Sequence, residues 1–169
     1  MDISKFHQLN IVLLCGLYGS GKTEFALKYF KGKDRSRISR SEIRKHMYEM
    51  IHFGEKWASD NFTEENDALV KHIERKTLEH FLFNKQKVLI VNTFLTKKSR
   101  KWFIEMAHGM KRTIGAIFLE RPLEQCLSRN EHNAVAVPRE VVTRLFYKIE
   151  PLEKSEGFDE VLTVNFKPS

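Results

Sequence analysis

Residues 16–23 read Gly-Leu-Tyr-Gly-Ser-Gly-Lys-Thr, and this stretch decides the fold. It matches the pattern G-x-x-x-x-G-K-S/T, follows an apolar run at residues 11–15 and precedes a segment with helical spacing of apolar residues. Glycines let the backbone curl so that successive N–H groups point at a phosphate, and the following helix adds the positive end of its dipole. The stretch therefore predicts a phosphate-binding loop formed by Gly16, Leu17, Tyr18, Gly19, Ser20, Gly21, Lys22 and Thr23.

The last two residues of this loop predict contacts with a nucleotide and a metal. In loops of this pattern the lysine reaches the β- and γ-phosphates, and the hydroxyl of the next residue binds Mg²⁺. Lys22 and Thr23 hold those positions, so the expected cofactors are ATP or GTP together with Mg²⁺. A glycine-rich turn that only joins a strand to a helix is the alternative. The complete pattern with both flanking elements favours phosphate binding.

The composition favours one globular domain spanning residues 1–169. The chain is 41% hydrophobic and contains no linker-like stretch. Cys15 and Cys126 are too few for a disulfide framework, so we expect buried free thiols and a cytoplasmic location. The first residues are neither a signal peptide nor a membrane span. The net charge of +7 would attract polyanions such as nucleic acid, although a solvated basic surface explains it equally well.

Short apolar runs alternate with amphipathic segments along the rest of the chain. We expect strands at residues 11–15, 38–39, 88–91, 114–119 and 161–164. Helices are expected from the loop to about residue 32, from Ser41 to near residue 54, over residues 60–83 and 102–109, and after Pro122 and Pro138. The alternation predicts βαβ units and a parallel sheet with helices on both faces. Ligands bind such sheets at the carboxyl ends of strands, where the sequence places Gly16, Ser39, Asn92 and Glu120.

The order of several short motifs resembles the polynucleotide 5′-kinase branch of the small P-loop kinases. Besides the loop, these motifs are Ser-Glu-Ile-Arg at 41–44, Val-Asn-Thr at 91–93, Ser-Arg-Asn at 128–130 and Val-Pro at 137–138. The ending at 149–160 adds Glu-Pro at 150–151 and Glu-Gly-Phe at 156–158. The resemblance covers nearly the whole chain. It implies a three-layer α/β/α P-loop NTPase fold with a five-stranded parallel sheet and a short lid. It also implies transfer of the γ-phosphate of ATP to the 5′-hydroxyl of a DNA or RNA strand.

The resemblance also implies roles for individual residues. Lys22 and Thr23 would hold the phosphates and the metal, Arg44 would contact the phosphate region of the acceptor, and Arg129 would be the lid arginine that bridges the phosphates. Cations around a γ-phosphate are suited to phosphoryl transfer, which depends mainly on positioning and charge neutralisation. The alternatives are a solvated helix residue for Arg44 and a helix-end cation for Arg129.

Two positions depart from the family on the acceptor side. Family members carry an aspartate where this chain has Ser41, and Asp-Thr-Asn where this chain has Asn-Thr-Phe from Asn92 onward. Glu42 is the one nearby carboxylate that could substitute, but one step along a helix turns its side chain by about 100°. Glu42 could instead only favour the N-terminus of its helix. Ser41 and Asn92 remain candidates for contacts with the acceptor.

Three functions follow from these features. The leading hypothesis is an ATP- and Mg²⁺-dependent kinase of the polynucleotide-kinase type. A catalytically degenerate nucleotide-binding module is the second, because of Ser41 and Asn92. A kinase for a small metabolite, a sugar or a protein hydroxyl is the third, since related folds phosphorylate all of these.

The basic run at residues 97–101 could follow a nucleic-acid backbone, but a solvated helix face is the favoured interpretation. The oligomeric state is left open.

Overall fold

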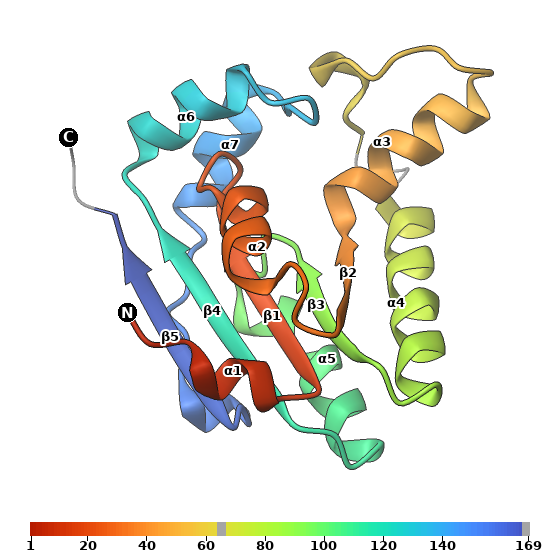
Figure 1. Ribbon diagram of the computed structural model, residues 1–169. Coiled ribbons are helices and arrows are strands. Elements are labelled where there is room, and N and C mark those ends of the chain that lie inside the picture. The colour runs from red at the N-terminus through yellow and green to blue at the C-terminus, as the bar shows by residue number, and fades with distance from the viewer. Residues whose placement is uncertain (64–66, 167–169) are drawn as a thin grey trace.

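The computed structural model describes residues 1–63 and 67–166. Five parallel strands form one sheet in the order β2-β3-β1-β4-β5 (Figure 1). The apolar runs form its centre, as expected of strands that are covered on both faces. Leu13 pairs with Ile90 on one side and with Ala116 on the other. The strands are β1 (Ile11–Gly16), β2 (Arg35–Ser39), β3 (Lys87–Val91), β4 (Ile114–Glu120) and β5 (Glu160–Asn165).

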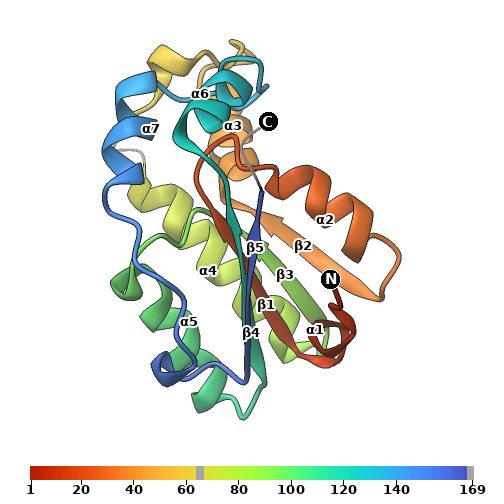
Figure 2. The same cartoon turned by 90° about the vertical axis from the view of Figure 1, so that its left-hand side faces the viewer.

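Helices cover both faces of the sheet and complete a three-layer α/β/α fold. Figure 2 shows α1 and α2 on one face and α4, α5 and α7 on the other. The helices are α1 (Ser4–Gln8), α2 (Lys22–Phe30), α3 (Arg40–Ile51), α4 (Asp67–Phe83), α5 (Lys97–Gly109), α6 (Leu123–Glu131) and α7 (Arg139–Phe146), with 3₁₀ turns η1 (Ser59–Asn61) and η2 (Lys154–Glu156). Across the described residues, none of the helices combines the length and the apolar character that crossing a bilayer requires.

Two hydrophobic clusters, one on each face, hold these layers together. Alternate residues of β1 supply both, because successive side chains of a strand point to opposite faces. The smaller cluster packs Val12 and Leu14 against Phe25 of α2. The larger cluster packs Leu13 of β1 against Leu78 of α4. Cys15 and Cys126 are buried and free, as the sequence predicts.

Three helices begin at residues other than the predicted ones. α5 begins at Lys97 and not near residue 102. α3 begins at Arg40 and not at Ser41, and its N-cap residue Ser39 makes no side-chain cap. The helix predicted over residues 60–83 is shorter, because α4 is described from Asp67 onward and η1 precedes it. Part of that prediction, residues 64–66, lies outside the described residues. Glu74 lies off the apolar stripe of α4, yet its side chain is completely buried.

The basic run at the start of α5 contains a structural cation. Arg100 is fully buried, and its Nε donates to Oε2 of Glu156 at 2.8 Å. Its Nη1 also donates to the carbonyl oxygen of Phe94 at 2.8 Å. Lys97 pairs with Glu153 on the surface. The run therefore anchors α5 to the segment around η2.

Candidate functional site

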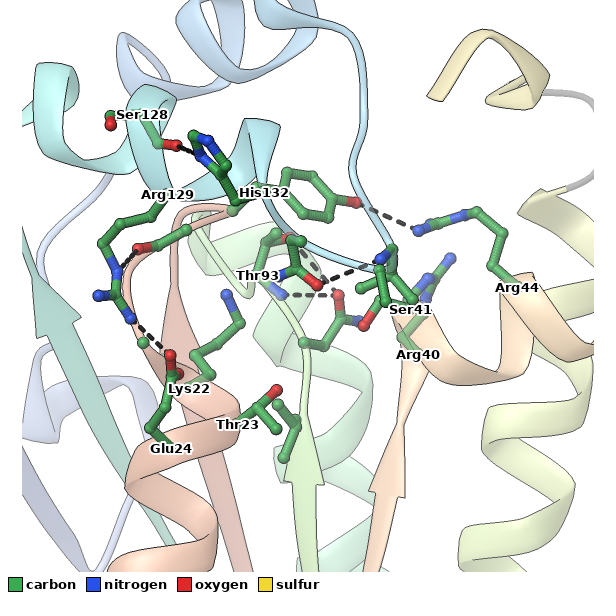
Figure 3. A pocket seen from close by; sticks show the side chains of 18 residues that line it. Lys22, Thr23, Glu24, Arg40, Ser41, Arg44, Thr93, Ser128, Arg129 and His132 are labelled. Carbon is green, nitrogen blue, oxygen red and sulfur yellow. Dashed lines mark hydrogen bonds and ion pairs between the residues drawn. The ribbon is translucent and has the colours of Figure 1, made fainter. Parts of the chain in front are cut away.

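A cavity of about 550 Å³ opens at the carboxyl ends of β1, β2 and β3 (Figure 3). The chain leaves β1 toward β2 and later leaves β3 toward β4, in the opposite direction. Such a reversal creates a crevice at the strand ends, where open parallel sheets bind ligands. The cavity is lined by Tyr18, Gly19, Gly21, Lys22, Thr23, Glu24, Arg40, Ser41, Arg44, Val91, Asn92, Thr93, Ser128, Arg129, His132, Asn133, Ala134 and Val135.

The predicted phosphate-binding loop forms one wall of this cavity. Gly16, Gly19 and Gly21 have φ of +145°, +78° and +99°, which L side chains rarely adopt. A Cβ on Gly19 would overlap the carbonyl oxygen of Cys126, so α6 packs against bare backbone there. α2 begins directly after the loop at Lys22. Its unpaired N–H groups and its dipole therefore favour an anion at this wall.

Two side chains of the loop region are suited to phosphate and metal binding. Lys22 Nζ donates to the carbonyl oxygens of Gly16 and Leu17, both at 2.8 Å. Desolvation under the loop lowers the pKa of Lys22 to about 8. A bound phosphate would supply a negative charge that favours the protonated amine. Thr23 lines the cavity beside it (Figure 3). The described residues contain no group of three or more His, Cys, Asp or Glu side chains that could hold a metal.

Arg129 lies over the phosphate-binding loop from the last turn of α6. Its Nε donates to the carbonyl oxygen of Gly19 at 2.9 Å, and its Nη2 pairs with Oε1 of Glu24 at 2.6 Å (Figure 3). The side chain of Arg129 keeps 41% of its exposure. The structure thus brings Arg129 to the loop, and its role as a lid arginine that bridges the phosphates stays a prediction.

The segment between α6 and α7, residues 132–138, is held from both sides. Buried Asn130 donates to the carbonyl oxygen of Val137 and accepts from its N–H. From the other side, the indole N–H of Trp57 donates to the carbonyl oxygen of Ala136 at 3.1 Å. His132 also lines the cavity, and its Nδ1 lies 2.9 Å from the carbonyl oxygen of Ser128. Residues 132–135 line the cavity at the place where the resemblance implies a short lid, and we call residues 132–138 the lid.

Arg44 lies on the wall opposite the phosphate-binding loop, on the first turns of α3 (Figure 3). It is buried, and its guanidinium bonds to the hydroxyl of Tyr18 at 3.3 Å and to Oδ1 of Asp67 at 3.0 Å. Burial alone would lower the pKa of Arg44, but Tyr18 and Asp67 raise it above its ordinary value. The guanidinium carbon of Arg44 lies 5.0 Å from the centroid of the Phe62 ring. Arg44 is therefore a fixed buried cation and not a solvated helix residue.

A second cation on this wall, Arg40, belongs to a hydrogen-bonded network with two acids. Its Nη1 pairs with Oε2 of Glu74 and its Nη2 with Oδ2 of Asp67, both at 2.7 Å. Asn92 joins the network from the end of β3, because its Nδ2 donates to Oε1 of Glu74 at 3.1 Å. Its Oδ1 accepts from the backbone N–H of Thr93 at 2.7 Å. Neither Arg40 nor Glu74 was singled out from the sequence.

The structure brings Ser41 and Asn92 to the cavity but not Glu42. The hydroxyl of Ser41 lies 3.3 Å from that of Ser39. Both carboxylate oxygens of Glu42 accept from the guanidinium of Arg37, at 2.8 and 2.9 Å, and Glu42 does not line the cavity. It is held instead by a residue of β2. The carboxylate that the sequence offered for the acceptor side thus points elsewhere.

The model of the AAA domain family matches residues 11–152, which include the loop, Arg44, Asn92 and Arg129. The chain belongs to the AAA domain family. Proteins of curated function offer no match to this AAA domain.

Three solved structures show which proteins share its fold. A gluconokinase from Sinorhizobium meliloti 1021 matches with a TM-score of 0.61 at 14% identity, covering 92% of this chain and 82% of that one. A shikimate kinase from Acinetobacter baumannii in complex with shikimate matches at 0.57 and 16%, covering 98% and 88%. A chain of the Pnkp1/Rnl/Hen1 complex matches at 0.52 and 20%, covering 70% of this chain and 38% of that one. This AAA domain therefore has the fold of small P-loop kinases.

Proposed function

We propose that this protein is a Mg²⁺- and ATP-dependent phosphotransferase that moves the γ-phosphate to the 5′-hydroxyl of a DNA or RNA strand. One observation carries the proposal: a single cavity has Lys22 and the phosphate-binding loop on one wall and the buried cation Arg44 on the other (Figure 3). A donor phosphate and an anionic acceptor can thus meet in one place. The order of motifs along the chain and the net charge of +7 support a nucleic-acid acceptor.

The donor side consists of the loop, Lys22, Thr23 and Arg129. The backbone N–H groups and Lys22 would hold the β- and γ-phosphates, and the hydroxyl of Thr23 would be the protein ligand of Mg²⁺. When bound there, Mg²⁺ supplies neutralisation of the charge on the phosphates. Arg129 would leave Glu24 and donate to the transferred phosphate, because a doubly charged phosphate attracts a guanidinium more strongly than one exposed carboxylate does.

The acceptor side orients a hydroxyl and its neighbouring phosphate. Arg44 and Arg40 would hold the phosphate of the acceptor strand, while Ser41 and Asn92 offer hydrogen bonds to the hydroxyl. The hydroxyl oxygen forms a bond to the γ-phosphorus as the bond to the β–γ bridging oxygen breaks. ADP leaves, and the proton of the hydroxyl goes to water. A loose transition state needs little help from a base, so this wall can act without a carboxylate.

A transfer assay tests this proposal. We expect γ-labelled ATP with Mg²⁺ to label a 5′-hydroxyl oligonucleotide, and not the same oligonucleotide carrying a 5′-phosphate. Arg44→Met should lower labelling by about 10- to 100-fold, because it removes a positioning cation. Lys98→Met makes the same charge change on the exposed surface of α5 and should leave labelling unchanged. Transfer to a small sugar or hydroxy acid instead would replace the nucleic-acid acceptor, and transfer to nothing would remove the phosphotransferase.

One observation favours a second candidate, a nucleotide-binding module without catalysis. Of the described residues that line the cavity, only Glu24 carries a carboxylate, and it lies on the nucleotide side. This candidate predicts thermal stabilisation by Mg·ATP that Lys22→Ala abolishes, with no turnover in any assay. Activity that appears only after Ser41→Asp or Asn92→Asp would support the module.

A further inference from the structure

Glu74 is a buried acid outside the cavity that the proposed function has not used. It lies in the middle of α4, and its side chain has no exposed surface. Removing a carboxylate from water costs several kcal/mol unless it is paired and hydrogen-bonded. Burial raises the pKa of Glu74, although Arg40 and Asn92 act against that shift. A helix held only by apolar packing would not need this group.

Both partners of Glu74 line the cavity, whereas Glu74 itself does not. Arg40 approaches from the start of α3, with its Nη1 2.7 Å from Oε2. Asn92 approaches from the end of β3, with its Nδ2 3.1 Å from Oε1. The two carboxylate oxygens thus connect the start of α3 with the end of β3. Each oxygen serves one residue of the cavity wall.

The carboxylate also decides which way the Asn92 amide faces. Because Glu74 accepts, the amide NH₂ must turn toward it, and the carbonyl oxygen then accepts from the N–H of Thr93. The oxygen also accepts from the hydroxyl of Thr93 at 3.5 Å, so one N–H of the NH₂ remains for a ligand. Arg40 is fixed likewise, because Asp67 takes its other terminal nitrogen at 2.7 Å. Neither side chain can reorient while Glu74 stays charged and in place.

We propose that Glu74 is a positioning residue for the phosphoryl acceptor, which from behind the wall fixes the amide of Asn92 and the guanidinium of Arg40 toward the acceptor hydroxyl and its phosphate. The proposal rests on the proposed phosphotransfer. A purely structural Glu74 would only join α4 to the sheet. The structural role predicts lost stability alone, whereas positioning predicts slower transfer by protein that is still folded.

Exchanging the two polar groups of the Glu74–Asn92 contact separates these roles. Glu74→Gln puts two amides in contact, and Asn92→Asp puts two carboxylates in contact, so each single variant should lower transfer to a 5′-hydroxyl oligonucleotide by about 10- to 100-fold. The double variant restores one acid and one amide, and should recover transfer to within about fivefold of the parent. The Kd of Mg·ATP from calorimetry should stay within about twofold throughout, because Glu74 touches no residue of the loop.

Controls and a second measurement decide between the outcomes. Glu79→Gln removes an acid from the same helix that pairs with Lys76 at the surface, and it should change nothing. If transfer falls only in proportion to the folded fraction, measured by circular dichroism, or if the double variant shows no recovery, the positioning role is refuted.

A parent protein that labels no acceptor would overturn the proposed function and, with it, the acceptor that Glu74 serves. The hold of Glu74 on the Asn92 amide is then tested by itself. Side-chain amide resonances of Asn92, assigned with Asn92→Ala, then decide. Positioning requires that they shift and exchange faster with water in Glu74→Gln but not in Glu79→Gln. Unchanged resonances would show that Glu74 does not hold the amide.

Discussion

Raising the pH from 7 to 9 should weaken the binding of Mg·ATP, because Lys22 loses its proton within that range. Desolvation under the loop lowers the pKa of Lys22 from its ordinary value of 10.5 to about 8. A lysine with a lowered pKa carries its full charge below that value and loses it as the pH rises through it. The phosphates of ATP do not compensate, since the last phosphate ionisation lies near pH 6.

The size of the effect follows from the protonated fraction of Lys22. With a pKa of about 8, roughly nine tenths of the amine is charged at pH 7 and roughly one tenth at pH 9. If only the charged form binds the phosphates, the Kd rises about tenfold, which is ~1.4 kcal/mol of binding free energy. Binding at pH 8 should then take up about half a proton per nucleotide, because the phosphate restores the charge of Lys22.

Isothermal titration calorimetry at pH 7, 8 and 9 measures both quantities. Buffers of different ionisation enthalpy report the proton uptake directly. Lys22→Met should bind more weakly but with no change across this range, since it keeps the chain length without a titrating group. A parent Kd that stays constant from pH 7 to pH 9, or a Lys22→Met variant with the same slope, would refute the assignment of this amine to the phosphates.

Three further predictions concern the loop, the anchor of α5 and the lid. Gly19→Ala should abolish Mg·ATP binding in calorimetry and lower the free energy of unfolding by about 1–3 kcal/mol, because the new Cβ would overlap a carbonyl oxygen and the backbone has positive φ. The control Gly109→Ala, which has open space around it, should raise the free energy of unfolding by about 0.5–1 kcal/mol. In urea unfolding, Arg100→Met should lower the free energy of unfolding by about 3–5 kcal/mol, because it leaves the buried carboxylate of Glu156 unpaired. An effect no larger than that of the exposed control Lys101→Met would contradict the role of Arg100 as the anchor of α5. Asn130→Ala should cost about 1–3 kcal/mol and speed proteolysis within residues 132–138, and unchanged cleavage would argue against its hold on the lid.

Features with a local cause could be predicted from the sequence. The loop pattern predicts a strand, a glycine-rich loop and a helix in succession, and α2 does begin at Lys22. The apolar run at 88–91 predicts a buried strand, since a strand that is covered on both faces is apolar throughout. Pro122 and Pro138 directly precede α6 and α7 because their fixed φ suits a helix start.

Features that depend on which surfaces meet could not be predicted in this way. Glu74 lies off the apolar stripe of α4, yet it is buried beside α3 and β3. The spacing of apolar residues reveals one buried face of a helix, and it could not predict that a second face is also covered. Arg100 lies in a run of cations that resembles a solvated surface, and its partner Glu156 follows 56 residues later. Whether Glu42 reaches the cavity depends on which residue begins α3, and sequence patterns predict helix boundaries only to within a few residues. The signal for Arg40 was its place directly after a strand, where site residues gather.

The indole of Trp57 has a consequence for how ligands bind. Its bond to Ala136 ties the stretch that follows α3 to the segment above the nucleotide side. A nucleotide that orders the lid would therefore also order the neighbourhood of the acceptor, and the second ligand would lose less conformational entropy. Nucleotide and acceptor would then bind with positive cooperativity, and indole fluorescence would follow either one.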